Sequence, residues 1–284
     1  MLLFDSDIGR LGNQMFMYAA ARAFSKIKKA QYAITDFRKL KYFKLTTEDY
    51  VFNELKKAWF KYRIQRYGLM KSLDLTDCWK DHYSDFLTES GHRKVIGYFQ
   101  GEWYFKQFED DIRKAFEVKN KHRQRFLKVY KKHMQAKKVV VVHIRRTDYL
   151  EHNWDSLGGS GFALPLSYYK KQVDALKESS AKFIFVSDDI SFAEKNFSYL
   201  KNAWFSHEDE ITDMQIIMHG DVCILSNSSF SWWGGWLNKK KNKQIFMPKY
   251  YCGFKVKKEY PVNIIPASFH TVDVDLSEVL EPSK

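Results

Sequence analysis

Short apolar runs alternate with stretches of helical periodicity in the second half of the chain. The runs are rich in Val, Ile and Phe without polar alternation, which is typical of parallel strands covered on both faces. They span residues 139–143, 183–186, 203–205, 222–225 and 244–247. Helices are expected between them, one beginning after Pro165 and one over residues 213–219. The pattern predicts a doubly wound α/β domain.

The first half of the chain has fewer regular patterns. An apolar run at residues 2–4 is followed by a glycine-containing turn over 9–12 and then by apolar residues at helical spacing. This order predicts a strand, a loop and a helix, with Asn13 as the helix N-cap.

The length of 284 residues suits about two domains. A composition of 45% hydrophobic and 29% charged residues is globular and excludes a disordered or collagen-like chain. Residues 121–138 hold eight Lys or Arg residues interleaved with apolar ones, which predicts a basic amphipathic helix. We place the domain boundary at its end, giving domains 1–137 and 138–284.

A net charge of +13 indicates an anionic partner: nucleic acid, a phosphate-bearing small molecule or a membrane surface. No export signal is recognised, and no apolar run is long enough to cross a membrane. Cys78, Cys223 and Cys252 are odd in number and lack metal-ligand spacing. We therefore expect a cytoplasmic protein with reduced thiols.

Polar clusters follow three of the predicted strands, at residues 143–148, 187–189 and 226–229. Because the carboxyl ends of parallel strands share one edge of the sheet, these clusters are expected to form one site. Arg145 and Arg146 suit a phosphate, and the serine-rich loop before Phe230 offers amide N–H groups at the positive end of a helix. A diphosphate is the expected ligand. The acidic residues of the site suit ribose hydroxyls or the N–H edge of a base such as guanine; they are Asp188, Asp189 and Asp213.

Sequence motifs narrow the function. The chain has no GxxxxGK[ST] loop and no GxGxxG after a strand, which disfavours ATP hydrolysis and dehydrogenase chemistry. Three other blocks occur in order, GRLGNQ at 9–14, HIRRTDY at 143–149 and SNSSFSWWGGWL at 226–237, with a weaker block YFQGEWYF at 98–105. On these blocks the chain resembles the family 11 glycosyltransferases, the α-1,2-fucosyltransferases, over nearly its whole length.

The resemblance implies a glycosyltransferase-B fold, in which two Rossmann-like domains face a central cleft. It also implies a GDP-β-L-fucose donor and inverting transfer of fucose to the 2-hydroxyl of a terminal β-galactose of a glycan. By similarity, His143 and Asp213 would meet the guanine and Arg145 the β-phosphate. The pyrophosphate loop would comprise Asn227, Ser228, Ser229 and Phe230. One departure is Arg10, where the family more often has a second glycine.

Cleavage of the fucose C1–O bond leaves negative charge on GDP. Arg145 and the helix dipole at Phe230 can stabilise that charge, so we expect metal-independent transfer without a cofactor. The DxD-like triplets at 5–7 and 273–275 are the counter-argument, because DxD binds a metal in another glycosyltransferase fold.

On the acceptor side, Asn13 is expected to orient the acceptor hydroxyl unless it is only a helix cap. Gln100 and Glu102 are expected to bind galactose hydroxyls. The general base is left open among several side chains, which are Asp5, Asp7, Glu102, Glu151 and His152.

Several candidates have purely structural alternatives. His143 could be a core residue, Arg146 could be the ion-pair partner of Asp148, and Asp188 and Asp189 could cap a helix. The tryptophans at 232, 233 and 236 are expected to pack in the core rather than to stack on a sugar.

Two alternative functions are also open. Within enzymes, these are a fucosyltransferase of other linkage and a transferase of another GDP-sugar. Outside enzymes, the alternative is a basic nucleic-acid-binding protein. The lack of any signature motif for nucleic-acid binding argues against it. The basic residues at 121–138 and 239–241 also fit loose attachment to an anionic inner membrane leaflet.

Overall fold

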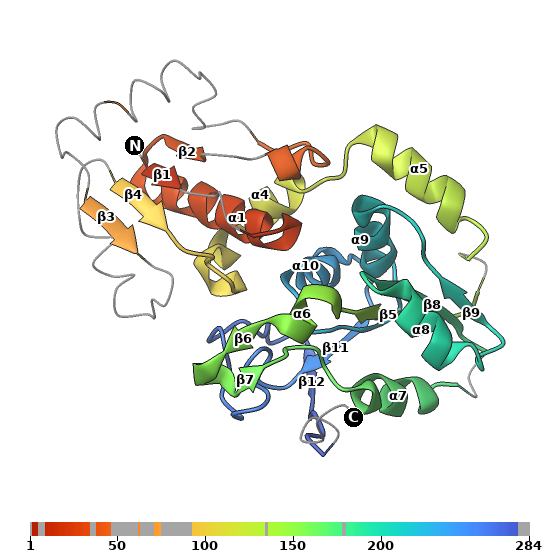
Figure 1. Cartoon of the computed structure of the whole chain (residues 1–284). Helices are drawn as coiled ribbons and strands as arrows, with labels where there is room; N and C mark the ends of the chain where they lie inside the picture. The colour runs from red at the N-terminus through yellow and green to blue at the C-terminus, as the bar shows by residue number, and fades with distance from the viewer. Residues whose placement is uncertain are drawn as a thin grey trace. The chain divides into compact units, whose positions relative to one another are not determined.

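The computed structural model describes residues 2–4, 9–34, 38–46, 62, 71–74, 93–133, 136–177 and 180–277 (Figure 1). The chain divides into two compact units, residues 1–119 and 120–284. Both are built on parallel sheets, so the chain has an α/β fold.

The first unit holds a four-stranded parallel sheet in the order β2-β1-β4-β3. The strands are β1 (Leu2–Phe4), β2 (Tyr32–Ile34), β3 (Lys71–Asp74) and β4 (Arg93–Ile96). Only β1 was predicted. Strands β3 and β4 contain charged residues, and the apolar run of β2 is only three residues long.

Helix α1 (Leu11–Lys28) joins β1 to β2 and is buried along most of its length. Its N-cap is Arg10, so the prediction that Asn13 caps the helix is wrong. The helix begins directly after the turn, and Asn13 lies inside its first turn. Helix α4 (Glu109–Ala115) is tied to α1 by Arg22, which is fully buried and pairs with both carboxylate oxygens of Asp111 at 2.8 and 3.1 Å. Three short 3-10 helices, η1 (Arg38–Leu40), η2 (Glu102–Tyr104) and η3 (Lys106–Phe108), complete the unit as described.

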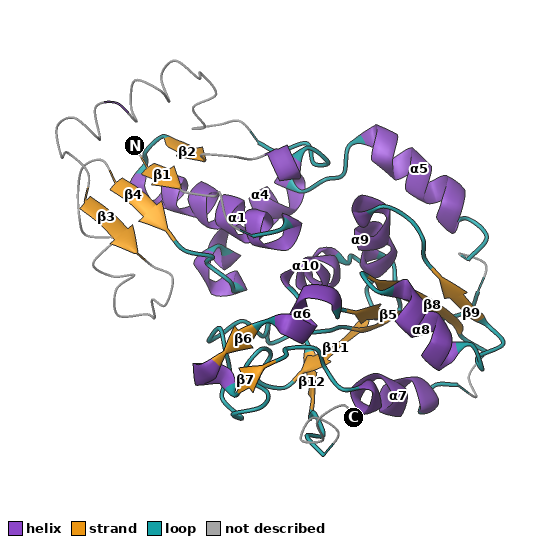
Figure 2. Ribbon diagram, in the orientation of Figure 1, coloured by secondary structure: helices purple, strands orange, loops and turns teal. Residues whose placement is uncertain are grey.

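The second unit holds a six-stranded parallel sheet in the order β12-β11-β10-β5-β8-β9. Figure 2 shows strands of this sheet in orange among purple helices. The strands are β5 (Val139–Ile144), β8 (Lys182–Ser187), β9 (Ala203–Phe205), β10 (Val222–Ile224), β11 (Gln244–Pro248) and β12 (His270–Val272). The five apolar runs are confirmed as strands. Strand β12 escaped prediction because it lies at the sheet edge and is largely exposed to solvent.

Helices connect these strands and cover the sheet. They are α5 (Asn120–Tyr130), α6 (Thr147–Glu151), α7 (Leu166–Asp174), α8 (Ile190–Phe197), α9 (Glu210–Met218) and α10 (Ser229–Leu237). After α6 the chain forms a small antiparallel hairpin of β6 (Asn153–Trp154) and β7 (Gly159–Ser160), joined by the 3-10 helix η4 (Asp155–Leu157). Trp232, Trp233 and Trp236 of α10 are buried, which confirms their place in the core.

The order of the strands fixes where a ligand can bind. The chain moves from β5 through β8 to β9, then returns to β10 on the other side of β5 and continues outward. The connections after β5 and β10 therefore leave in opposite directions. In doubly wound sheets this switch point, at the carboxyl ends of the strands, is where ligands bind.

Helix α5 belongs to the second unit, which corrects the predicted boundary after residue 137. Phe126 of α5 is buried and lies 4.7 Å from the ring of His219, at the end of α9. Arg125 adds ion pairs to Glu208 and Asp209 at 3.2 and 3.0 Å. The sequence shows that this helix has an apolar stripe, but not which unit covers it.

Candidate functional site

A buried polar pair bridges the switch point of the second sheet. His143, near the end of β5, lies 2.8 Å from the hydroxyl of Ser226, which follows β10. The imidazole also contacts the ring of Phe230 at 5.6 Å. Burial lowers the pKa of His143 to about 3, so the ring is neutral at pH 7. The structure thus brings His143 together with two residues of the predicted serine-rich segment, Ser226 and Phe230.

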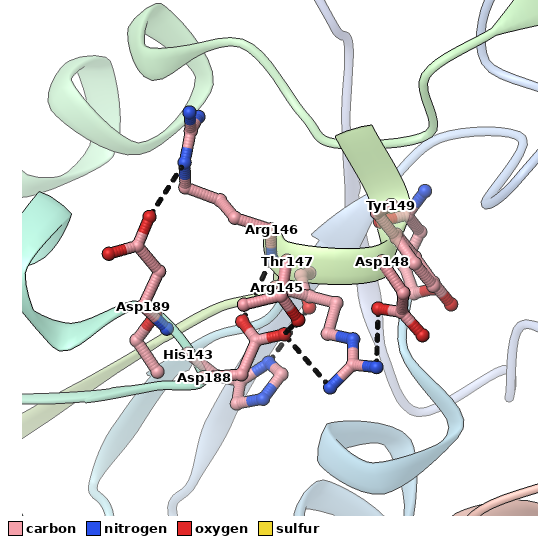
Figure 3. Close-up of polar contacts among 11 residues, drawn as sticks. His143, Arg145, Arg146, Thr147, Asp148, Tyr149, Asp188 and Asp189 are labelled. Atoms are coloured by element: carbon pink, nitrogen blue, oxygen red, sulfur yellow. Dashed lines mark hydrogen bonds and ion pairs between the residues drawn. The ribbon is translucent and has the colours of Figure 1, made fainter. Parts of the chain in front are cut away.

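Arg145 lies between two carboxylates just past the end of β5 (Figure 3). Nη1 is 3.0 Å from Asp188 Oδ2, and Nη2 is 2.5 Å from Asp148 Oδ1. The guanidinium also lies 5.3 Å from the ring centre of Tyr149. With its side chain 12% exposed, Arg145 is a cation in a defined orientation at the carboxyl edge of the sheet.

Asp188 organises the loop that carries both arginines. Its Oδ1 accepts the backbone N–H of Arg146 at 2.9 Å, and its Oδ2 accepts the Thr147 hydroxyl and forms the ion pair with Arg145. Burial would raise the pKa of Asp188, but these hydrogen bonds and the charge of Arg145 outweigh burial and lower it. The carboxylate is therefore ionised at neutral pH.

Arg146 points away from Arg145 (Figure 3). Its guanidinium lies 3.7 Å from the ring centre of Phe192, and its Nε is 3.5 Å from Asp189 Oδ2. The predicted alternative pair between Arg146 and Asp148 is wrong, because Arg145 occupies Asp148 instead. Asp189 caps α8 by accepting the N–H of Phe192 at 3.2 Å, as the structural alternative predicted. Asp188 does not cap this helix, so that alternative is wrong for Asp188; its carboxylate contacts Arg145 and Arg146 instead.

The serine-rich loop after β10 ends at the N-terminus of α10, with Ser228 in the N-cap position. Ser228 is buried, whereas Ser229 and Phe230 are half-buried. Asn227 is fully buried; its side chain donates to the Phe162 carbonyl at 2.9 Å. Free amide N–H groups of the first helical turn and the helix dipole make this end attractive to an anion.

Asp213 comes from α9, which crosses from β9 to β10. Ser206, directly after β9, donates a hydrogen bond of 2.5 Å to Asp213. Burial raises the pKa of Asp213 to about 7. Sequence reasoning missed Ser206, although a polar residue directly after a predicted strand was the available signal.

In the first unit, the side chain of Gln100 donates a 2.8 Å hydrogen bond to Asn13 Oδ1. Asn13 follows β1 and Gln100 follows β4, and these strands are neighbours in the sheet. Phe99 has a positive φ of 51° and packs edge-on against Phe4 and Phe24, which anchors the turn before Gln100. Two residues predicted separately are therefore joined.

Glu102 follows in η2 and pairs with Lys106 at 2.7 Å. Asp5 and Asp7, two candidates for the base, lie outside the described residues. The other two, Glu151 and His152, are exposed at the end of α6.

Within the described ranges, no group of three or more His, Cys, Asp or Glu side chains could hold a metal ion. Asp273, from the second DxD-like triplet, is 80% exposed and pairs with Lys249 at 3.1 Å. Cys223 and Cys252 are free thiols, whereas Cys78 lies outside the described residues. No helix in the described part of the chain is long and apolar enough to span a membrane.

Comparison with known proteins identifies the family of this chain. The model of glycosyl transferase family 11 matches residues 4–261. The chain belongs to this family. Among similar proteins, the α-1,2-colitosyltransferase of Escherichia coli is 30% identical over 256 residues, which cover 81% of this chain and 85% of that protein.

Solved structures support the fold of this family 11 glycosyltransferase. A mutant of Arabidopsis thaliana FUT1 in complex with GDP superposes with a TM-score of 0.54 and 10% identity, covering 87% of this chain and 69% of that one. The α-1,6-fucosyltransferase NodZ from Bradyrhizobium, soaked with GDP-fucose, gives a TM-score of 0.54 and 10% identity, covering 83% and 92%. The parallel α/β architecture is consistent with the glycosyltransferase-B fold.

Proposed function

We propose that the enzyme transfers L-fucose from GDP-β-L-fucose to the 2-hydroxyl of a terminal β-galactose, with inversion. The observation that carries this proposal is the site at the switch point of the second sheet, where Arg145, neutral His143 and the N-terminus of α10 share one edge. Family membership and solved relatives that hold GDP or GDP-fucose support a nucleotide-sugar donor.

Each part of this edge suits a different part of the donor. The guanidinium of Arg145 and the first amides of α10 suit the diphosphate and stabilise the charge that develops on departing GDP. His143 stays uncharged and can exchange one hydrogen bond with guanine, and the carboxylate form of Asp213 can accept its N–H groups. One charge-assisted hydrogen bond contributes about 1.5–3 kcal/mol, so we expect Arg145→Ala to lower kcat/KM tenfold to a few hundredfold.

We propose metal-independent catalysis on the same grounds, because Arg145 and the helix dipole supply positive charge where the leaving group forms. Transfer should therefore persist in excess EDTA. Loss of transfer in EDTA with recovery on adding Mn²⁺ would overturn this part of the proposal.

The acceptor belongs, in our proposal, to the first unit. The hydrogen-bonded pair of Asn13 and Gln100 offers one amide to orient the 2-hydroxyl and another to bind a neighbouring hydroxyl. Glu102 is the carboxylate that we propose as base, released from Lys106 when the acceptor binds.

A second donor is favoured by one observation, the similarity to an α-1,2-colitosyltransferase. Colitose is L-fucose without its 3-hydroxyl, so GDP-colitose would share every contact to the nucleotide described above. A site that hydrogen-bonds the 3-hydroxyl discriminates strongly against the deoxy sugar, because its polar groups would be left unpaired.

The deciding experiment uses the purified protein with GDP-fucose or GDP-colitose and a panel of galactose-ended oligosaccharides, and maps the product linkage by NMR. A binding test precedes the transfer assay: GDP, but not ADP or UDP, should raise the melting temperature of the protein. If only single-stranded nucleic acid raised the melting temperature, with steep salt dependence, the enzyme proposal would fail.

Helix α5 supports a further part of the proposal, peripheral contact with an anionic membrane. Its apolar side chains Phe126 and Tyr130 are buried, and the helix has no acidic residue. Its solvent-exposed side chains are therefore largely cationic; they include Lys121, Arg123 and Lys128, and exposed Lys131 follows the helix directly. Co-sedimentation with anionic but not neutral vesicles is expected at low salt, and its absence would refute the contact.

A further inference from the structure

An exposed aromatic ring stands on the hairpin that follows α6. Trp154, in β6, is 44% exposed, whereas the other described tryptophans are buried or half-buried. Leu150 and Val256 are also exposed. The hairpin packs on the segment that carries Val256, because a Cβ at Gly158 would lie 3.6 Å from that side chain. Of these exposed apolar side chains, Trp154 has the largest ring that a ligand could contact.

The ring of Trp154 is held in place. It makes edge contacts with Phe162 at 6.2 Å and with Tyr260 at 5.1 Å, with interplanar angles of 80° and 77°. The amide of Gly161 donates to the carbonyl of His152 at 2.8 Å and braces the base of the hairpin. A ring fixed in this way loses little conformational freedom when a ligand stacks on it.

Successive contacts connect Trp154 to the donor site. The guanidinium of Arg145 lies over Tyr149, the ring of Tyr149 contacts Phe162 at 6.4 Å, and Phe162 contacts Trp154. The Phe162 carbonyl accepts a hydrogen bond from Asn227, in the loop before α10. Trp154 is therefore part of the framework of the donor site, but two rings separate it from Arg145.

The surroundings of the ring favour a sugar as its ligand. Exposed polar side chains adjoin Trp154 in the sequence and can exchange hydrogen bonds with hydroxyls; they are Glu151, His152, Asn153 and Asp155. A hexopyranose presents C–H groups on one face, which pack on the electron-rich face of an aromatic ring, and hydroxyls around its edge.

The balance of charge at the hairpin also favours a neutral ligand such as a sugar. The positive side chains of the segment are Lys255, Lys257 and Lys258, and nearby negative side chains offset them, namely Glu151, Asp155 and Glu259. The patch has no excess charge that would favour an anionic membrane or a nucleic acid.

We propose that Trp154 is the stacking platform of an outer acceptor subsite. It binds not the galactose that receives the transferred sugar but a sugar further along the same glycan. This inference rests on the proposed function and deepens it, because it states that acceptors longer than one sugar are recognised by the second unit.

The test compares acceptors of increasing length: a methyl β-galactoside, a galactosyl disaccharide and a galactose-ended tetrasaccharide. With Trp154→Ala, the KM for the tetrasaccharide should rise about tenfold, while the KM for the methyl galactoside and for the donor stays within twofold. Trp154→Phe should keep most of the affinity. Tyr199→Ala, at an exposed aromatic residue beyond α8, is the matched control and should change none of these constants.

The outcomes separate this inference from the proposed function. If the wild-type protein transfers sugar to none of the acceptors, the proposed function fails. If it is active but Trp154→Ala leaves the preference for longer acceptors unchanged, the outer subsite is refuted. An equal loss on all three acceptors would also refute it, since that result indicates a structural role. If Trp154→Ala loses vesicle binding without a change in KM, the ring contacts a membrane and the outer subsite is refuted. If it loses dimerisation without a change in KM, the ring contacts a second copy of the chain and the subsite is likewise refuted.

Discussion

Replacement of Asp188 by asparagine tests whether this carboxylate orients Arg145. Asp188 accepts two hydrogen bonds, from the N–H of Arg146 at 2.9 Å and from the hydroxyl of Thr147, and forms an ion pair with the guanidinium of Arg145 at 3.0 Å. The Asp188→Asn substitution would remove the charge that pairs with Arg145 and place an NH2 group where Oδ2 now accepts the Thr147 hydroxyl. The side chain of Asp188 is 18% exposed, so water compensates only in part.

The size of the effect follows from these bonds. A charge-assisted hydrogen bond contributes about 1.5–3 kcal/mol, and partial relaxation leaves a loss of about 2–4 kcal/mol for the pair. We expect that loss to be divided between folding stability and donor binding, so that GDP binds about 10- to 100-fold more weakly. Because the pKa of Asp188 is lowered, its contribution to stability is present at neutral pH and is lost as the pH falls below about 4.

Urea denaturation without ligand and calorimetric titration with GDP measure the two parts separately. Asp189→Asn is the matched control, because it lies at the same strand end but caps α8; it should cost about 1 kcal/mol or less and leave GDP binding intact. If Asp188→Asn binds GDP within threefold of wild type, Arg145 does not depend on Asp188 and the reasoning is refuted.

Three other predictions concern the framework around the sites. Gly9→Ala should displace Asn13, because the φ of Gly9 is 86° and an added Cβ would lie 2.6 Å from Asn13 Cβ. We expect kcat/KM to fall at least tenfold with little loss of folded protein. Unchanged transfer kinetics would show that Asn13 has no role. The contribution of His143 to stability should rise with pH between about 3 and 6.5, because the buried ring is neutral while the unfolded ring binds a proton. Comparison of wild type with His143→Gln in urea titrations should therefore show a difference in slope of up to about 1.4 kcal/mol per pH unit, and identical slopes would contradict burial of a neutral ring. Asp111→Ala should destabilise by about 3–5 kcal/mol, because it removes the carboxylate that pairs with the fully buried guanidinium of Arg22, and a loss below 1 kcal/mol by thermal or urea unfolding would contradict the importance of that pair.

Much of the second unit could be predicted from the sequence, whereas little of the first could. Strands such as β5 and β8 are covered on both faces, so their residues must be apolar throughout, and such runs are visible without any structure. Strands β2 and β4 have only three and four residues, and their pairing with β1 is decided by neighbours distant in the sequence. Helix α5 was predicted as an element but assigned to the wrong side of the boundary for the same reason.

The candidate site shows the same division. Which residues gather at the carboxyl edge was predictable, because strand direction places every residue that follows a parallel strand at that edge. Their partners were not predictable, since adjacent arginines point in different directions: Arg145 lies between two carboxylates, and Arg146 lies on Phe192.

The fold class, the family resemblance and the polar residues at the strand ends follow from the linear order of residues, because they depend on local composition and spacing. The folded arrangement was needed to show that His143 meets Ser226, that Asn13 meets Gln100 and that Asp189 is a cap. The first two contacts join residues at or after the ends of different strands, and the third depends on the residue at which α8 begins, which is set by packing. Their geometry depends on strand order and on the direction of each side chain, neither of which is encoded in any short stretch of the chain.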